Sequence, residues 1–143
     1  METNAKKAKE FFTNGFNCAQ SVLSVFCEKY GLSSATAAKM SCGMGSGFRF
    51  GQICGAASGA VLVVGLKCGQ TVTGDKEAKQ LCYEKTEEFL KLFRERNESF
   101  ICREILGCDI STKEGSELAR AQFTTTCVRM IESAVCLLEE LEY

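Results

Sequence analysis

Histidine is absent from this chain of 143 residues, and its absence removes several kinds of active site. Without an imidazole there is no Ser–His or Cys–His nucleophilic pair, and no zinc site with mixed Cys and His ligands. The side chain that ordinarily titrates near neutral pH is missing as well. Any chemistry must therefore come from thiolates, carboxylates, lysine, arginine, tyrosine or a bound cofactor.

An excess of positive charge is also absent. The chain has 17 Lys and Arg residues against 18 Asp and Glu residues, which gives a formal net charge of −1. Proteins that bind nucleic acid neutralise its phosphates with a basic surface. We therefore expect no nucleic-acid partner.

Segments that direct a chain to a membrane or out of the cell are not indicated. The first ten residues, METNAKKAKE, lack the apolar stretch of a signal peptide. The longest apolar run, Ile53 to Leu66, spans 14 residues and is interrupted by Gly, Ser and Cys. A membrane-spanning helix needs roughly 20 apolar residues. We expect a cytoplasmic protein with no membrane insertion.

The glycine-rich stretch GMGSGFRFG, residues 43–51, does not match a nucleotide-binding motif. Phe48 and Phe50 stand where G-x-G-x-x-G requires glycine, and the chain has no G-K-[ST]. We interpret the stretch as a loop whose glycines permit unusual backbone angles or close approach to another segment. No arrangement typical of a two-carboxylate acid–base site is present.

Alternation of apolar and polar residues, the mark of a β-strand, is missing over more than a few residues, whereas helical spacing recurs along most of the chain. The sequence predicts an all-α fold: a single domain of residues 1–143, built as a bundle of about six to seven helices with the glycine-rich loop just before the helix that begins at about residue 52. Asn17 and Asp75 are expected helix caps, and Gly31 is an expected C-terminal glycine. The predicted helices cover residues 4–13, 17–30, 33–42, about 52–67, 76–98 and 100–107, and a last helix follows a loop at residues 109–115.

Ten cysteines are the unusual feature of the composition. In a secreted chain an even number would suggest a disulfide framework, but we expect a reducing compartment here. No pair forms a C-x-x-C motif, so the local patterns of zinc ribbons, thioredoxin-like dithiols and bacterial ferredoxins are missing. Any cluster of thiols must be assembled by the fold. The cysteines are residues 18, 27, 42, 54, 68, 82, 102, 108, 127 and 136.

Three cysteines are expected at helix N-termini. Cys18 follows the Asn17 cap, Cys54 lies in the first turn of its helix, and Cys102 comes three residues after Ser99. Free N–H groups and the helix dipole favour a thiolate at such positions.

The other interpretation of each cysteine is a small buried apolar residue, because free cysteine is among the most buried residue types. Cys82 and Cys136 fit that description. Cys27 follows Cys18 by nine residues, which places the two on nearly opposite faces of one helix. Cys127 and Cys136 have the same spacing.

Helix packing accounts for the small residues that follow Cys54. Gly55, Ala56, Ser58, Gly59 and Ala60 remove bulk from one helix, so neighbouring backbones can approach it closely. Thiols from other helices could then meet Cys54 without an intervening side chain.

Four blocks of sequence resemble one known family: GFNCAQSVL, GQICGAASGAVLVVGL, FICREILGCD and TTCVRMIESAVCLLEEL. In this order they are similar to the C_GCAxxG_C_C putative redox-active family, small helical proteins named for four recurrent cysteines and a CGAxxG motif. The resemblance places the four cysteines at Cys18, Cys54, Cys102 and Cys127, and residues 54–59 match the motif without a break. It implies redox activity of the thiols. Cys27, Cys42, Cys68, Cys82, Cys108 and Cys136 lie outside the pattern, with Cys108 close enough to Cys102 to be a reserve candidate.

A more distant similarity, to the cysteine-bearing part of split-Soret cytochromes, points towards iron–sulfur chemistry. The chain has no C-x-x-C-H haem attachment site, since it has no histidine.

Three hypotheses of function follow. The first is an electron-transfer protein whose Cys18, Cys54, Cys102 and Cys127 bind an iron–sulfur cluster or another thiolate-ligated metal centre such as zinc. The second is a thiol–disulfide oxidoreductase in which Cys54 attacks and Cys102 or Cys18 resolves. The third is a metal-free helical interaction module, as in a homodimer, with an inert cysteine core. The sequence names no redox partner.

Overall fold

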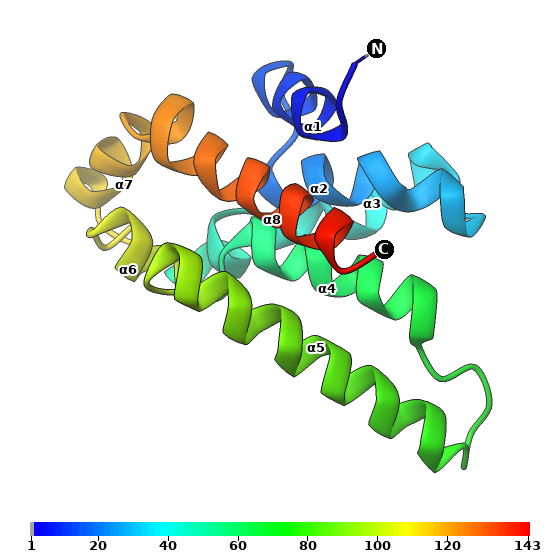
Figure 1. Cartoon of the computed structure of the whole chain (residues 1–143). Coiled ribbons are helices and arrows are strands. Elements are labelled where there is room, and N and C mark those ends of the chain that lie inside the picture. Colours follow the sequence, from blue (N-terminus) through cyan, green and yellow to red (C-terminus); the bar gives the residue numbers. More distant parts are fainter. Residues whose placement is uncertain (1) are drawn as a thin grey trace.

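The computed structural model describes residues 2–143 and is helical along most of that length (Figure 1). The all-α fold predicted from the sequence is confirmed. Within the described residues the α-helices are α1 (Asn4–Thr13), α2 (Cys18–Phe26), α3 (Ser34–Ser41), α4 (Gly55–Cys68), α5 (Lys76–Asn97), α6 (Cys102–Leu106), α7 (Lys113–Arg120) and α8 (Val128–Glu140). Short 3₁₀ turns cover Cys27–Tyr30 and Cys42–Met44, and π-type turns cover Gly47–Gly51 and Phe123–Cys127. No helix of residues 2–143 is long and apolar enough to cross a membrane.

Local capping explains where several helices begin. The Asn17 side chain accepts a hydrogen bond from the N–H of Gln20, and the Gln20 side chain accepts one from the N–H of Asn17, which forms a capping box before α2. Asp75 accepts from the N–H of Ala78 at the start of α5. Gly31 ends the 3₁₀ turn Cys27–Tyr30, which follows α2, and it has the left-handed conformation with φ of 80°. These three positions agree with the sequence prediction.

Two predicted boundaries were wrong. The last helix begins earlier than expected and is interrupted: Thr112 caps α7 within the predicted loop 109–115, and the π-type turn Phe123–Cys127 separates α7 from α8. Helix α4 begins at Gly55 instead of about residue 52, because residues 52–54 are held in an extended segment by other backbone partners. The described residues therefore contain eight α-helices.

Helix α4 lies at the centre of the hydrophobic core, where it contacts α2, α5 and α8. The fully buried side chains that fill the space between these helices include Leu23 of α2, Val63 and Val64 of α4, Phe89 and Phe93 of α5, and Ile131 and Leu138 of α8. Cys27 is also completely buried in this core.

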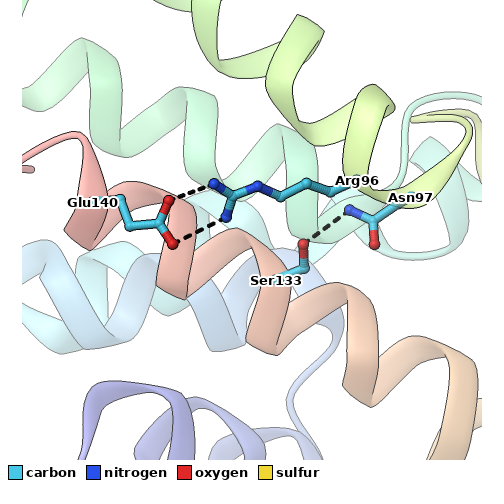
Figure 2. Close-up of polar contacts among 4 residues, drawn as sticks. All are labelled: Arg96, Asn97, Ser133 and Glu140. Carbon is cyan, nitrogen blue, oxygen red and sulfur yellow. Dashed lines mark hydrogen bonds and ion pairs between the residues drawn. The ribbon is translucent and has the colours of Figure 1, made fainter.

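Polar contacts join the C-terminal end of α5 to α8 (Figure 2). The Arg96 guanidinium forms a two-pronged contact with the Glu140 carboxylate, and Asn97 donates a hydrogen bond to Ser133 Oγ at 2.9 Å. The ion pair is largely exposed and contributes little stability on its own. The two contacts link the end of α5 to α8 beside the packed core.

Close packing of α2 on α4 depends on the small residues after Cys54. A Cβ atom on Gly59 would lie 2.7 Å from the carbonyl oxygen of Ala19, and one on Gly55 would lie 2.9 Å from Cβ of Cys18. The two backbones are therefore as near to each other as glycine permits. This approach brings the first turn of α2, with Cys18, against the first turn of α4.

Replacement of Gly59 by alanine is expected to destabilise the protein by about 1 to 2 kcal/mol. The added methyl group meets backbone atoms of α2, an overpacking cost of about 1–3 kcal/mol, which exceeds the helix propensity gained. Thermal or urea unfolding measures the change. Gly65→Ala is the matched control, because it lies in the same helix with nothing within 4 Å of the new Cβ, and it should be neutral or stabilising. Equal effects of the two substitutions would contradict this packing account.

Candidate functional site

A cavity of about 730 Å³ opens where the starts of several helices meet. Cys18, Cys54, Cys102 and Cys127 all contribute to its wall, although up to 109 residues of chain separate them. Figure 1 shows α6, α7 and the start of α8 together at this end of the bundle. The fold thus brings all four cysteines of the family pattern to one place.

Three of the four cysteines stand at helix N-termini, as the sequence predicts. Cys18 is the first residue of α2, Cys54 is the N-cap of α4, and Cys102 is the first residue of α6. The backbone N–H groups of Ala56 and Ala57 point at the Cys54 sulfur. Ser99, the expected cap, lies outside the helix. Its hydroxyl accepts a hydrogen bond from the N–H of Ile101, which is the N-cap residue, and α6 begins at Cys102.

A short antiparallel backbone contact sets Cys54 beside Cys102. Ile53 and Ile101 form an isolated β-bridge. The N–H of Cys54 donates to Phe100 O at 2.7 Å, and the N–H of Cys102 donates to Gln52 O at 2.5 Å. Periodicity along the sequence gives no indication of this bridge, because each side is only about three residues long. It holds the backbones of Cys54 and Cys102 next to each other.

The glycine-rich loop closes over Cys102. Residues 46–49 all have positive φ, and among them Ser46, Phe48 and Arg49 are not glycine. Gly47, with φ of 61°, would carry a Cβ only 2.4 Å from the backbone nitrogen of Gln52 and 2.9 Å from Cβ of Cys102. The sequence predicted that glycines of this stretch have unusual backbone angles or lie close to another segment. Gly47 does both.

Cys127 ends the π-type turn before α8, and its sulfur lies in contact with that of Cys18. A hydrogen bond from the Cys18 thiol lowers the pKa of Cys127 below its ordinary value. The same hydrogen bond, together with burial, raises the pKa of Cys18 well above its ordinary value. In the metal-free protein, this pair therefore holds a thiolate on Cys127 more readily than on Cys18.

The remaining two cavity thiols are held neutral. Burial raises the pKa of Cys54 to about 11, although the N–H groups of Ala56 and Ala57 act in the opposite direction. Burial, with the neighbouring cavity thiols, raises the pKa of Cys102 to about 12. The helix N-terminus favours a thiolate at Cys54, as the sequence suggests, but burial outweighs it. Cys54 is thus not the most acidic cavity thiol in this structure.

Apolar side chains form most of the rest of the wall, and Arg49 is the only charged side chain among the described lining residues. Cys42, an exposed residue, reaches the rim as a fifth thiol. Sequence reasoning did not assign Cys42 to the site. Its position at the end of α3, next to the glycine-rich loop, was the available clue. The apolar wall consists of Phe12, Phe16, Ile105, Leu106, Phe123 and Met130.

The cysteines outside the family pattern lie elsewhere. Cys27, in the 3₁₀ turn after α2, is fully buried in the main core and does not line the cavity with Cys18. Cys136 was predicted to be a small core residue, and this was wrong because it is exposed on α8. Cys108 is half-buried near Cys102 but lines a separate small groove with Arg103 and Asp109.

The four cavity thiols fit part of what the metal centre suggested by the sequence requires. Four thiols in one cavity match the ligands of iron–sulfur clusters in type and number. Among residues 2–143, however, no three His, Cys, Asp or Glu side chains converge closely enough to hold a single metal ion. The cavity thus fits a thiolate-bound centre by its chemistry, and the sulfur atoms are not gathered around one point.

One protein family matches the chain over residues 16–141, under the description "Putative redox-active protein (C_GCAxxG_C_C)". The chain belongs to this family. The match includes all four cavity cysteines of the pattern and the motif at residues 54–59. No curated protein and no solved structure matches the chain. The chain is therefore a cysteine-rich, all-α member of this family.

Proposed function

We propose that this chain is one helical domain that transfers electrons through an iron–sulfur cluster, with Cys18, Cys54, Cys102 and Cys127 as ligands. The observation that carries the proposal is their common cavity: four thiols from separate elements, all belonging to the family pattern, share one wall. Of the other six cysteines, Cys42 alone reaches this cavity, at its rim, and the rest lie elsewhere in the described residues.

The chemistry of the wall supports a soft metal centre. Thiolates select iron–sulfur clusters, zinc and copper(I), whereas magnesium and calcium need oxygen ligands. No described lining residue carries a carboxylate. The apolar side chains around the thiols would keep water away, and low solvent access is one of the factors that set the potential of a redox centre.

A cluster places weaker demands on the positions of the sulfur atoms than a single zinc ion does. A tetrahedral zinc ion with Zn–S bonds of about 2.3 Å keeps its sulfurs roughly 3.8 Å apart around one point. The described cysteines do not converge in this way. A cluster spreads its ligands over several iron atoms, so its thiolates need no single focus.

The chain's own groups have definite tasks in this proposal. When bound, the cluster would supply one-electron transfer. The N–H groups of Ala56 and Ala57 donate to the Cys54 sulfur and favour its charged form. The Ile53–Ile101 bridge keeps Cys54 and Cys102 in place, and Arg49 at the rim supplies positive charge beside a site of thiolates.

Anaerobic reconstitution tests the proposal. The protein would be incubated with ferrous iron, sulfide and a thiol reductant, desalted, and measured by visible absorption and by electron paramagnetic resonance before and after dithionite. We expect thiolate-to-iron absorption that bleaches on reduction, with a paramagnetic signal in one of the two states. A protein that stays colourless and silent after this treatment would rule out a cluster.

A second candidate, a thiol–disulfide oxidoreductase, rests on the contact between Cys18 and Cys127. The lowered pKa of Cys127 makes it the attacking thiolate in this scheme, with Cys18 as the resolving thiol, in place of the attack by Cys54 suggested by the sequence. Attack of Cys127 on a substrate disulfide would form a mixed disulfide, and Cys18 would then displace the reduced substrate.

Alkylation of the metal-free protein at pH 7 distinguishes Cys127 from its neighbours. Iodoacetamide reacts with the thiolate, so Cys127 is expected to react at least about tenfold faster than Cys54 and Cys102, whose pKa values are about 11 and 12. Peptide mass spectrometry after timed quenching gives the individual rates. Faster alkylation of Cys54 than of Cys127 would remove the basis for this second candidate.

A further inference from the structure

A second pair of thiols lies at the other end of α4. Cys68 is the last residue of this helix, about 21 Å along its axis from Cys54 at 1.5 Å per residue. Cys82 lies two turns into α5, and the loop of residues 69–75 joins the two helices. In Figure 1 this loop closes the α4–α5 hairpin at the end that lies away from α6 and α7. Neither cysteine belongs to the family pattern or to the cavity wall.

The thiols of Cys68 and Cys82 are within hydrogen-bonding reach of each other. The Cys68 sulfur also donates to Val64 O at 3.1 Å, which fixes its direction at the end of α4. The phenol of Tyr143 lies near both sulfurs. Two thiols on neighbouring helices thus lie beside each other.

Both side chains of the pair are half-buried, so a small reagent can reach them. The ammonium groups of Lys67 and Lys85 lie close to Cys68 and would stabilise a thiolate formed there. Burial acts in the opposite direction and keeps Cys68 mostly protonated at neutral pH, because it raises the pKa of this thiol. Partial exposure, a facing thiol and nearby cations are the features of a thiol pair that can exchange with disulfides.

We propose that Cys68 and Cys82 form a second dithiol, separate from the cavity, which closes to a disulfide by exchange with a low-molecular-weight disulfide such as oxidised glutathione. One protein thiolate attacks the glutathione disulfide, forms a mixed disulfide and releases one glutathione thiolate. The other protein thiol loses its proton and attacks the protein sulfur of the mixed disulfide, which expels the second glutathione. The two cysteines lose two electrons and two protons, and oxidised glutathione gains them as two glutathione thiols.

The disulfide would join the end of α4 to α5 and close a loop of 15 residues, 68–82. A cross-link of this size restricts the unfolded chain, so oxidation is expected to raise the melting temperature by roughly 5 to 10 °C. The inference is independent of the cavity cysteines, and its outcome does not depend on whether a cluster is bound there.

Trypsin separates the two cysteines, which makes the disulfide directly measurable. Cleavage after Lys67, Lys76, Lys79 and Lys85 leaves Cys68 in peptide 68–76 and Cys82 in peptide 80–85. The full-length protein would be incubated with oxidised glutathione, quenched with acid and N-ethylmaleimide, digested and analysed by mass spectrometry. We expect these two peptides joined by a disulfide in most molecules.

Two serine variants are compared with the wild type for formation of the Cys68–Cys82 disulfide. Cys82→Ser should leave Cys68 as a mixed disulfide with glutathione and should show no oxidation-dependent rise in melting temperature. Cys136→Ser removes an exposed thiol on α8 and should still form the linked peptides. Separate peptides in the wild type, whether alkylated or carrying glutathione, would overturn the proposal. So would an equal rise in melting temperature in the Cys82→Ser variant.

Discussion

Replacement of Cys54 by serine is expected to leave the reconstituted protein with less than about a tenth of the wild-type iron. The hydroxyl of serine is a hard donor that does not ionise near neutral pH, so it is a poor substitute for a thiolate. The Cys54 sulfur also accepts hydrogen bonds from the backbone N–H groups at the start of α4, and no other cysteine stands at that helix start. The same loss is expected for serine at Cys18, Cys102 or Cys127, since each lines the cavity. Iron and acid-labile sulfide would be measured after anaerobic reconstitution.

Cys136→Ser is the matched control for this series, because Cys136 is exposed and distant from the cavity wall. It should retain the wild-type iron content. Far-ultraviolet circular dichroism of every variant separates loss of ligand from loss of fold. Wild-type iron content in three or four of the cavity variants would contradict the proposed ligand set.

Replacement of Gly47 by alanine is expected to destabilise the protein by about 2 to 4 kcal/mol. Alanine in the left-handed conformation costs roughly 1–2 kcal/mol, and the methyl group would overlap the backbone of Gln52 at 2.4 Å, which adds an overpacking cost of about 1–3 kcal/mol. The methyl group also meets Cβ of Cys102 at 2.9 Å. Because that contact displaces a proposed ligand, iron binding should weaken at least about tenfold as well. Thermal unfolding and iron titration measure the two effects.

Gly43→Ala provides the comparison within the same glycine-rich stretch. Gly43 has no heavy atom within 4 Å of its added Cβ and no positive φ, so its replacement should change stability by less than about 1 kcal/mol. If the Gly47 and Gly43 variants were equally stable and bound iron equally well, the loop would not be holding Cys102 in place.

Much of the fold could be predicted because local chemistry sets it. Helix α1 has its predicted bounds, and α5 begins where predicted because Asp75 caps its start; it ends within one residue of its predicted end. The close packing of α4 on α2 also follows from sequence, since Gly59 leaves no atom to keep Ala19 away. The first turn of α7 was predicted as loop because Gly115 resembles a loop residue, whereas the Thr112 side chain caps the helix through the N–H of that glycine.

The candidate site was only partly accessible from sequence. The family pattern named Cys18, Cys54, Cys102 and Cys127, and their role as ligands remains a prediction. Their meeting in one cavity depends on tertiary contacts such as the Ile53–Ile101 bridge, which has no local sequence pattern. The order of the thiol pKa values could not be foreseen either. It depends on which sulfur donates in the Cys18–Cys127 pair and on the burial of Cys54, and neither follows from position at a helix N-terminus.

The most direct test of the central claim is the iron, zinc and acid-labile sulfide content of protein purified without oxygen, together with its visible spectrum. The proposed function predicts iron and sulfide in similar proportion, with thiolate-to-iron absorption in the visible range. Zinc without iron or sulfide would instead indicate a Cys₄ zinc site, and protein free of all three would leave the thiol–disulfide candidate and the metal-free interaction module. Either of these two results would contradict the electron-transfer cluster.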